Sequence, residues 1–563
     1  MTILNTIKNE LESYKNGTVE LFDGIPYSAH KLVRRINLFK NQYYPTGKQD
    51  SQGNIKYWYD IISPRVDAEV KNIDFDTKDI VLVSDPEEDA GKLLIANARL
   101  KDFLRETGQA AKLNESIERG VEWGNVVWKK VKGDYQIVEL DKFMVLNQTA
   151  KTLDDSDVIE YEVMTPVDIR KKVGVWENVE KLIEAGKKEE GKTAPEFHIY
   201  ERNGEITTRE YYEAKGEKGG DEKTYLLAKV IVGGTEKDAP SEVLFCNEMT
   251  KKPYKEYHRS KYSGRWIRQG MYEILFDCQT RANEIGNQIA RGLEWASKTV
   301  FRSSDRVIAQ NIMTDLVSGD VIKSVDLQQV QTRMDGFDQL IADWNRNLQT
   351  ADSLANSFEV VTGESLPSGT PFRLGERLNA NANKLFDFLR EKLGIAFQDV
   401  VGEWILPELL KDLRAKTVIK LTADSGVLTR YYEMLVESWY VQNLVSLPPH
   451  GPEVAVLFKE AKLQELLRNK EATVKLERAM WDDFKPRATV VITGENVNLS
   501  AELEDLRNFA TIEPDPVRRT ALVEIAMKKR GIDVDKLPKS PPQPPAAQEM
   551  SQTQPQRSEQ ERI

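Results

Sequence analysis

Residues 186–193 match the phosphate-binding P-loop pattern, a glycine, four residues, then Gly-Lys-Thr. In a working P-loop a buried strand precedes the loop and a helix follows it, so that backbone N–H groups face the phosphates. Here the sequence predicts a polar helix before the motif, and Ala194, Pro195 and a strand after it. Residues 187–190 would also bring two carboxylates against the nucleotide. We therefore interpret the match as coincidental, and keep a P-loop DNA-translocating NTPase only as an alternative.

Other residue types that support chemistry do not form a recognisable site. Asp85 follows the apolar run 80–83 and resembles a magnesium-binding aspartate at a strand end, but the acidic turn after it favours an ordinary edge strand. The histidines show no HExxH spacing and no cysteine companions, and a Gly-x-Ser-x-Gly elbow is absent. They are His30, His198, His258 and His450. The sequence thus predicts no catalytic residues, no metal site, no cofactor and no enzyme activity.

Composition narrows the class of protein further. The chain has 563 residues, 40% of them hydrophobic, so it is long enough for several domains with sizeable cores. Its 90 acidic and 79 basic residues give a net charge of −11, which does not favour general nucleic-acid binding but suits a surface past which a duplex slides. Cys246 and Cys278 suggest no disulfide framework. No apolar run is long enough for a membrane span or signal peptide, so we expect a reducing cytoplasm and no membrane partner.

The stretch 264–413 is the most strongly patterned part of the chain. We expect a helix over 267–296, a compact insert, a second helix over 336–358, a Gly/Pro/Ser loop, and a third helix over 375–413. Apolar residues at steps of three and four form a continuous seam on the first two helices. The residues that we assign to a subunit-packing or interhelical seam are Ile274, Ile285, Ile289, Leu293, Trp344 and Leu348.

Around this stretch the sequence resembles a known family. The run from Pro253-Tyr254 through Tyr262-Ser-Gly-Arg-Trp to Gly270-Met-Tyr-Glu-Ile-Leu-Phe-Asp-Cys-Gln279, with Asn283 following, resembles the wing-to-stem junction of tailed-bacteriophage portal proteins. The order of elements beyond it is similar to stem, clip, stem, tunnel loop and spine. Thr489-Val-Val-Ile-Thr-Gly-Glu495 and the helix after it look most like podovirus-type portals. The resemblance spans roughly residues 61–535.

The resemblance implies an α+β portal fold that forms rings. It divides the chain into an N-terminal arm (1–60), a wing (61–262, β-rich over 197–246), stem helix 1 (263–297), a small α/β clip (298–334), stem helix 2 (335–358), a tunnel loop (359–374), a spine helix (375–415), a wing return and crown (416–536) and a disordered tail (537–563). Basic and aromatic residues in 1–60 also suit stacking of single-stranded nucleic acid, but we favour an arm that docks on a neighbouring subunit.

The resemblance also implies partners and contact residues. The expected assembly is a dodecameric homo-oligomer at one capsid vertex of the virion, built in the host bacterial cytoplasm. The expected partners are double-stranded DNA, the terminase large subunit, major capsid and scaffold proteins, and tail adaptor or head-completion proteins. Candidate DNA contacts in the channel loop are Ser365, Ser368, Thr370, Arg373 and Arg377. Candidate adaptor contacts in the clip are Arg302, Arg306, Lys323 and Arg333. A helical scaffold without a DNA role is the remaining alternative.

Local patterns outside the long helices give further expectations. We expect helices over 93–104, 113–121, 428–447, 454–484, 499–510 and 516–530. We expect strands over 126–131, 136–145 and 489–493, and a solvated loop over 215–223. Asn203-Gly204, the strongest short hairpin signal, should turn a hairpin between 198–202 and 206–212.

Overall fold

The computed structural model divides the chain into two units, Met1–Ile492 and Thr493–Ile563. It describes residues 2–50, 53–84, 90–187, 196–297, 300–302, 328–330, 336–356, 372–415, 418–420, 432–437, 452–467, 473–475 and 484–490, with a few scattered positions besides. In the second unit only residues 509, 519 and 523 are described, each as helical, so the helices and tail predicted there lie largely outside the described residues. The helices and strands that position the candidate site all belong to the first unit.

Two helices near the N-terminus contribute residues to the hydrophobic core of this unit. Helices α1 (Ile3–Asn16) and α2 (Ala29–Lys40) begin at capping side chains of Thr2 and Ser28, and β1 (Val19–Glu20) pairs with β2 (Pro26–Tyr27) between them. One face of α1 is buried because its apolar residues recur at helical spacing. The prediction of an arm over 1–60 missed this packing, since these two helices are short and flanked by polar residues.

A five-stranded antiparallel sheet forms the β-rich part, in the order β10-β9-β8-β7-β6. Its strands are β6 (Phe143–Val145), β7 (Val158–Met164), β8 (Phe197–Thr207), β9 (Tyr225–Gly234) and β10 (Glu242–Glu248). Helices α6 (Pro166–Arg170) and α7 (Val179–Lys187) pack against it around a separate small core that includes Leu182 and Phe197. Residues 217–223 are exposed, as the predicted solvated loop requires.

The hairpin predicted at Asn203-Gly204 is wrong. Strand β8 runs straight through both residues and ends at Thr207, whose hydroxyl caps α8 (Thr208–Ala214) in a capping box with Glu210. Asn203 is fully buried, and its amide donates to the Tyr254 hydroxyl at 2.9 Å. A Cβ at Gly204 would lie 2.2 Å from the Asp157 carboxylate. The glycine therefore serves a close side-chain approach and not a turn.

A three-stranded sheet, ordered β11-β4-β5, lies against the long helix α13 (Phe372–Val400). Its strands are β4 (Asn125–Val131), β5 (Asp134–Ile137) and β11 (Tyr254–His258), so the strand predicted over 136–145 is in fact two strands, β5 and β6. The helices before it are α3 (Ser63–Ile73), α4 (Ala90–Glu106) and α5 (Gln109–Trp123). Both helix predictions in this region are confirmed. Strand β3 (Ile80–Val83) pairs with β16 (Arg487–Val490), so residues far apart in sequence share one small sheet.

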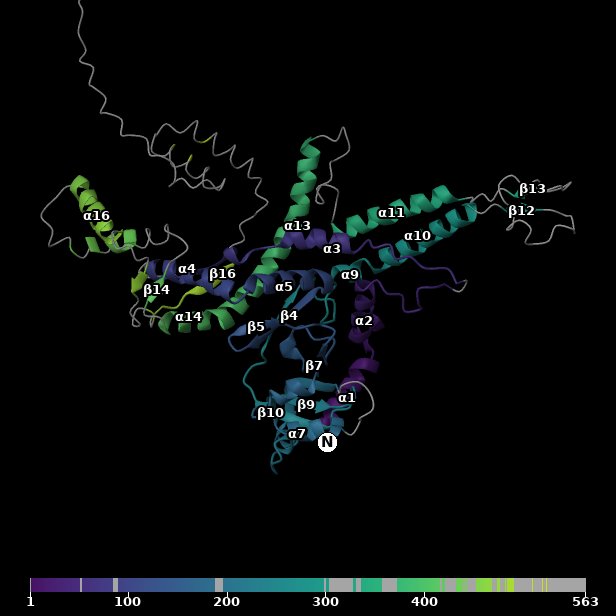
Figure 1. The fold of residues 1–563 in the computed structure, drawn as a ribbon, viewed down its shortest axis with the longest axis horizontal. Helices are drawn as coiled ribbons and strands as arrows, with labels where there is room; N and C mark the ends of the chain where they lie inside the picture. The colour runs from purple at the N-terminus through teal and green to yellow at the C-terminus, as the bar shows by residue number, and fades with distance from the viewer. Residues whose placement is uncertain are drawn as a thin grey trace, which may run out of the picture. The chain divides into compact units, whose positions relative to one another are not determined.

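The long helices follow in the predicted order (Figure 1). They are α9 (Met271–Ile274), α10 (Phe276–Ser297), α11 (Phe337–Ala355), α13 (Phe372–Val400), a π-helical turn η6 (Val401–Ile405) and α14 (Leu406–Ala415). Between α10 and α11, β12 (Val300–Arg302) pairs with β13 (Gln328–Val330). The first helix starts at Met271 and not at Ile267, because residues 264–270 form a partly buried loop whose backbone bonds to other parts of the chain.

Helix α13 lies against the three-stranded sheet. Its buried face includes Phe386, Leu393 and Phe397, and the Phe397 ring contacts the rings of Trp128 and Tyr135 at centroid distances of 5.9 and 5.7 Å. This aromatic cluster fixes one end of α13 to the three-stranded sheet.

The last described elements depart from the prediction. Helix α16 (Pro452–Leu467) is shorter than the predicted 454–484, because β15 (Thr473–Lys475) pairs with β14 (Val418–Lys420). Thr473 and Val474 are β-branched and favour a strand. The helix predicted over 428–447 is seen at 432–437 and at a few positions beyond.

Candidate interaction site: the paired helices and the segment that holds them

Helices α10 and α11 lie antiparallel and side by side (Figure 1). The Asn347 amide donates to the carbonyl of Cys278 at 2.9 Å, and Arg281 pairs with Asp343 at 2.6 Å. Because the numbers fall on α11 as they rise on α10, the two helices run in opposite directions between the core and the insert.

The burial of the predicted seam residues decreases along this pair of helices toward the insert. Ile285 is fully buried, while Ile274, Ile289, Trp344 and Leu348 are partly buried. Leu293, nearer the insert, has 54% of its surface exposed. The seam is therefore an interhelical contact within one chain at its base, and its role in packing between subunits stays a prediction.

A ladder of amide side chains on α10 binds a separate segment of the chain. Gln279, Asn283 and Asn287 are four residues apart, so they lie on one face of the helix. The Tyr57 N–H donates to Asn287 Oδ1 at 2.7 Å, the Tyr59 N–H donates to Asn283 Oδ1 at 2.8 Å, and the Ile61 N–H donates to Gln279 Oε1 at 2.9 Å. Two of the side-chain amide nitrogens also bind this segment: Asn287 donates to the Tyr57 carbonyl and Gln279 donates to the Tyr59 carbonyl. We call residues 57–61 the strap.

Gly286 lets the strap approach α10 closely. A Cβ at this position would lie 2.4 Å from the Tyr59 ring, and the Tyr59 hydroxyl donates to the Gly286 carbonyl at 3.2 Å. The same ring packs edge-on against Trp344 of α11, with centroids 5.6 Å apart. Tyr59 thus contacts both helices of the pair, which links the strap to their relative position.

Helix α3, which follows the strap, also contacts α11. Arg65 donates to the Ile61 carbonyl at 2.6 Å and forms an ion pair with Asp352. The strap and α3 together attach the paired helices to the core of the unit.

The thiols of Cys246 on β10 and Cys278 on α10 are not activated for nucleophilic chemistry. Burial raises the pKa of Cys246 to about 11, and burial likewise raises the pKa of Cys278. Thiols with raised pKa values stay protonated at neutral pH and are poor nucleophiles. Both cysteines are free.

The P-loop match lacks the required local structure. Gly186 and Lys187 are the last residues of helix α7, and the next described element, β8, is a strand. This is the reverse of the strand-then-helix order that a P-loop needs, while residues 188–193 lie outside the described residues. Among the residues that the structure describes, no group of three or more His, Cys, Asp and Glu side chains could hold a metal ion. In the same part of the chain, no helix is both long and apolar enough to cross a membrane.

The candidate DNA and adaptor contacts fall at the edge of the described residues. Arg373 and Arg377 lie in the first turns of α13, which begins directly after Pro371, so they are helical and the predicted loop is shorter than 359–374. Arg302 ends β12. The other candidates lie outside the described residues: Ser365, Ser368, Thr370, Arg306, Lys323 and Arg333.

Comparisons with known proteins give remote structural neighbours only. A scan against models of protein families found no match, and a search of curated proteins found none either. Among solved structures, the neck of an empty GTA particle computed with C6 symmetry aligns with a TM-score of 0.33 and 11% identity, covering 70% of this chain and 90% of that one. The neck of the native GTA particle computed with C12 symmetry gives 0.33 and 11%, over 80% and 97%. The virion of the native gene transfer agent particle gives 0.32 and 11%, over 80% and 98%. At these values the likeness carries no argument about function.

The amide ladder is the feature that sequence reasoning missed. In the sequence, Gln279 and Asn283 stand out only as part of the family resemblance, without a role. The available signal was the repetition of an amide at i, i+4 and i+8 on a face next to the apolar seam, where a helix would ordinarily carry apolar or charged residues.

Proposed function

We propose that this chain is the subunit of a portal ring in a tailed bacteriophage or a related particle. The observation that carries the proposal is the antiparallel pair α10–α11, which brackets an insert closed by β12 and β13 and is followed by the long helix α13. This is the order of stem, clip, stem and spine that the sequence resemblance implies. The strap and the amide ladder support the proposal because they hold two protruding helices in a fixed direction, as a rigid channel lining requires.

In this role the chain is a structural component that surrounds a channel, and it catalyses no reaction. Twelve copies would surround a channel for double-stranded DNA, with the terminase large subunit and later a tail adaptor bound at the insert. The basic residues Arg302, Arg306, Lys323 and Arg333 are the proposed adaptor contacts, and Arg373 and Arg377 with the serines and threonine of the preceding loop are the proposed DNA contacts. The negative net charge favours sliding over tight binding of the duplex.

The experiment is a measurement of assembly mass and of ATP turnover on the same purified protein. The proposal predicts a discrete assembly of about twelve times the subunit mass of 64.3 kDa, with no ATP hydrolysis in the presence or absence of DNA. DNA-stimulated hydrolysis that Lys192→Ala abolishes would instead support the P-loop alternative. A small oligomer without turnover would support a scaffold role.

A further inference from the structure

Two of the four histidines in the sequence lie at the contact between the N-terminal helices and the five-stranded sheet. His30 is in the first turn of α2, and His198 is on β8. Both residues are half-buried. The ordinary pKa of an imidazole, 6.5, lies closer to neutral pH than that of the other side chains at this contact. The charge of the contact can therefore change in mild acid.

Helix α1 is held on the sheet by two ion pairs. Near its middle, Glu10 pairs with Arg202 of β8 at 2.8 Å. In its last turn, Lys15 pairs with Asp238, which lies in the turn between β9 and β10. Asp238 is itself held in place, because its N–H donates to the Tyr200 hydroxyl at 2.7 Å and that hydroxyl donates to Asp238 Oδ1 at 3.1 Å. The end of α1 thus depends on one well-positioned carboxylate.

The charges around His30 are mostly positive. The cations that face it are Lys15, Arg34 and Lys237, against one carboxylate, Asp238. Because Asp238 is already paired with Lys15, little negative charge is left to balance an imidazolium here. Burial and these cations together hold the pKa of His30 below its ordinary value.

His198 contacts a tyrosine ring and charges of both signs. Its Nδ1 lies 2.7 Å from the Tyr161 hydroxyl, and the two rings stack with centroids 5.9 Å apart. Burial and the ammonium group of Lys237 hold the pKa of His198 below its ordinary value. The charged groups around it are Lys15, Lys237, Glu196 and Asp238.

We propose that these groups form a pH-sensitive latch, which holds α1 on the five-stranded sheet at neutral pH and loosens in mild acid. The latch consists of His30, His198, Lys15, Lys237 and Asp238. An imidazolium at either histidine repels the two ammonium groups and competes with Lys15 for the Asp238 carboxylate. This inference goes beyond the portal proposal and does not depend on ring formation.

The direction of the effect follows from the lowered pKa values of the two histidines. When α1 is released, both imidazoles return toward their ordinary pKa of 6.5 and bind more protons than in the docked state. The contact is therefore strongest above pH 6.5 and weakens as the pH falls from 6.5 through the lowered values. Carboxylates with ordinary pKa values of about 4 stay charged in this interval, so other ion pairs persist.

Hydrogen exchange of the full chain at pH 7.5 and pH 5.5, corrected for the intrinsic pH dependence of exchange, tests the proposal. We expect the protection of residues 3–16 to fall about fivefold at the lower pH. A double variant with His30→Gln and His198→Gln stays neutral at both positions, so its protection should change by less than about twofold.

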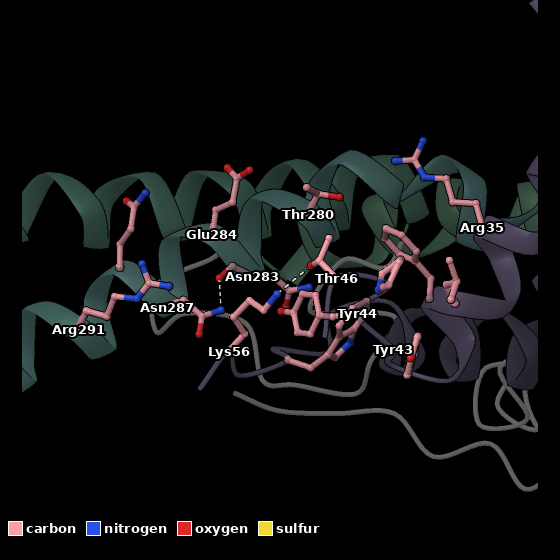
Figure 2. Close-up of a pocket in the computed structure, with 15 residues that line it drawn as sticks. Arg35, Tyr43, Tyr44, Thr46, Lys56, Thr280, Asn283, Glu284, Asn287 and Arg291 are labelled. Carbon is pink, nitrogen blue, oxygen red and sulfur yellow. Dashed lines mark hydrogen bonds between the residues drawn. The ribbon is translucent and has the colours of Figure 1, made fainter. Parts of the chain in front are cut away.

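Helix α10 supplies the internal control within the same experiment. The residues that line the cleft beside it, among them Asn283 and Asn287 (Figure 2), include no histidine. We expect the protection of α10 to change by less than about twofold between the two pH values.

Lys237→Gln provides a second test that leaves both imidazoles in place. It removes an exposed cation that faces both histidines, and should reduce the fall in α1 protection to about twofold. Lys8→Gln is the matched control, because Lys8 is an exposed lysine of α1 that is not among the groups facing either histidine. It should keep the full fall.

Three results would overturn the proposal. They are equal protection of α1 at the two pH values, equal falls in the Lys237→Gln and Lys8→Gln variants, and a fall in α10 as large as that in α1, which would indicate general unfolding in acid. The comparison of the two lysine variants decides the question if the double histidine variant does not fold.

Discussion

Asn287 binds both backbone polar groups of Tyr57: its Oδ1 accepts from the Tyr57 N–H at 2.7 Å and its Nδ2 donates to the Tyr57 carbonyl at 2.9 Å. The side chain of a helix residue thus makes the two backbone hydrogen bonds that a neighbouring β-strand would otherwise make. Two further amides extend the contact: Asn283 accepts from the Tyr59 N–H, and Gln279 accepts from the Ile61 N–H and donates to the Tyr59 carbonyl. The direction of the paired helices thus depends on polar contacts to a segment more than 200 residues away in sequence.

Asn287→Ala removes both of these hydrogen bonds and leaves the Tyr57 N–H without its acceptor, while the Tyr57 carbonyl keeps its bond from the Tyr44 hydroxyl at 3.0 Å. We expect the free energy of unfolding to fall by about 1–3 kcal/mol and the melting temperature to drop measurably. Gln288→Ala is the matched control, because Gln288 is the next residue, is exposed, and makes no contact with the strap among the described hydrogen bonds. Equal melting temperatures for the two variants would show that the strap is not held by the ladder.

The seam gives a second prediction. Ile285→Asp places a carboxylate at a fully buried position, which should cost more than about 3 kcal/mol and prevent a stable fold. Leu293→Asp, on the same face but 54% exposed, should leave the melting temperature nearly unchanged. Thermal denaturation of both variants checks this, and a normal melting curve for Ile285→Asp would mean that the packing at the base of the pair is misassigned.

A third prediction concerns pH. Glu201 on β8 contacts Lys129 at 2.9 Å and Lys229 at 2.8 Å. Burial opposes ionisation of Glu201, but the two ammonium groups outweigh burial and hold the pKa of this carboxyl below its ordinary value. A carboxyl with a lowered pKa stabilises the fold above the pKa of the unfolded chain, and that contribution is lost as pH falls through the folded value.

Glu201→Gln should therefore destabilise the protein at pH 7 by about 2 kcal/mol, with a difference that shrinks as the pH falls below the ordinary carboxyl pKa of 4.5. Glu205→Gln, an exposed position on the same strand, should show no such dependence. Urea denaturation across pH provides the comparison. A deficit of Glu201→Gln that stays constant down to pH 3 would exclude the electrostatic explanation.

The long helices could be predicted from sequence because their apolar residues repeat with helical period over many turns. The bounds of α10, α11 and the α13–α14 run agree with the expectation to within a few residues. Such patterns are local, and tertiary contacts do not need to be known to read them. The edge strand ending before Asp85 is likewise predicted from a local apolar run, and β16 overlaps the strand expected over 489–493, but the pairing of the two strands is not predicted.

The errors arose where a local signal was overruled by a distant contact. Asn203-Gly204 has the sequence of a turn, but Asp157 and Tyr254, far away along the chain, use the small residue and the amide to pack against a continuous strand. Residues 1–60 have the polar composition of an arm. In the structure, however, Arg202 of β8 forms an ion pair with Glu10 of α1 at 2.8 Å and anchors α1 to the sheet. The strap depends on the same kind of contact. None of these long-range contacts produces a periodic pattern in the sequence, so local patterns cannot predict them.

Negative-stain electron microscopy of the purified full-length chain tests the central proposal most directly. A portal subunit should appear as rings with a central hole, with twelve-fold symmetry in averaged end views and projecting paired helices in side views. Particles that remain single subunits, or that assemble without a central hole, would contradict the proposal that α10, α11 and α13 line a channel.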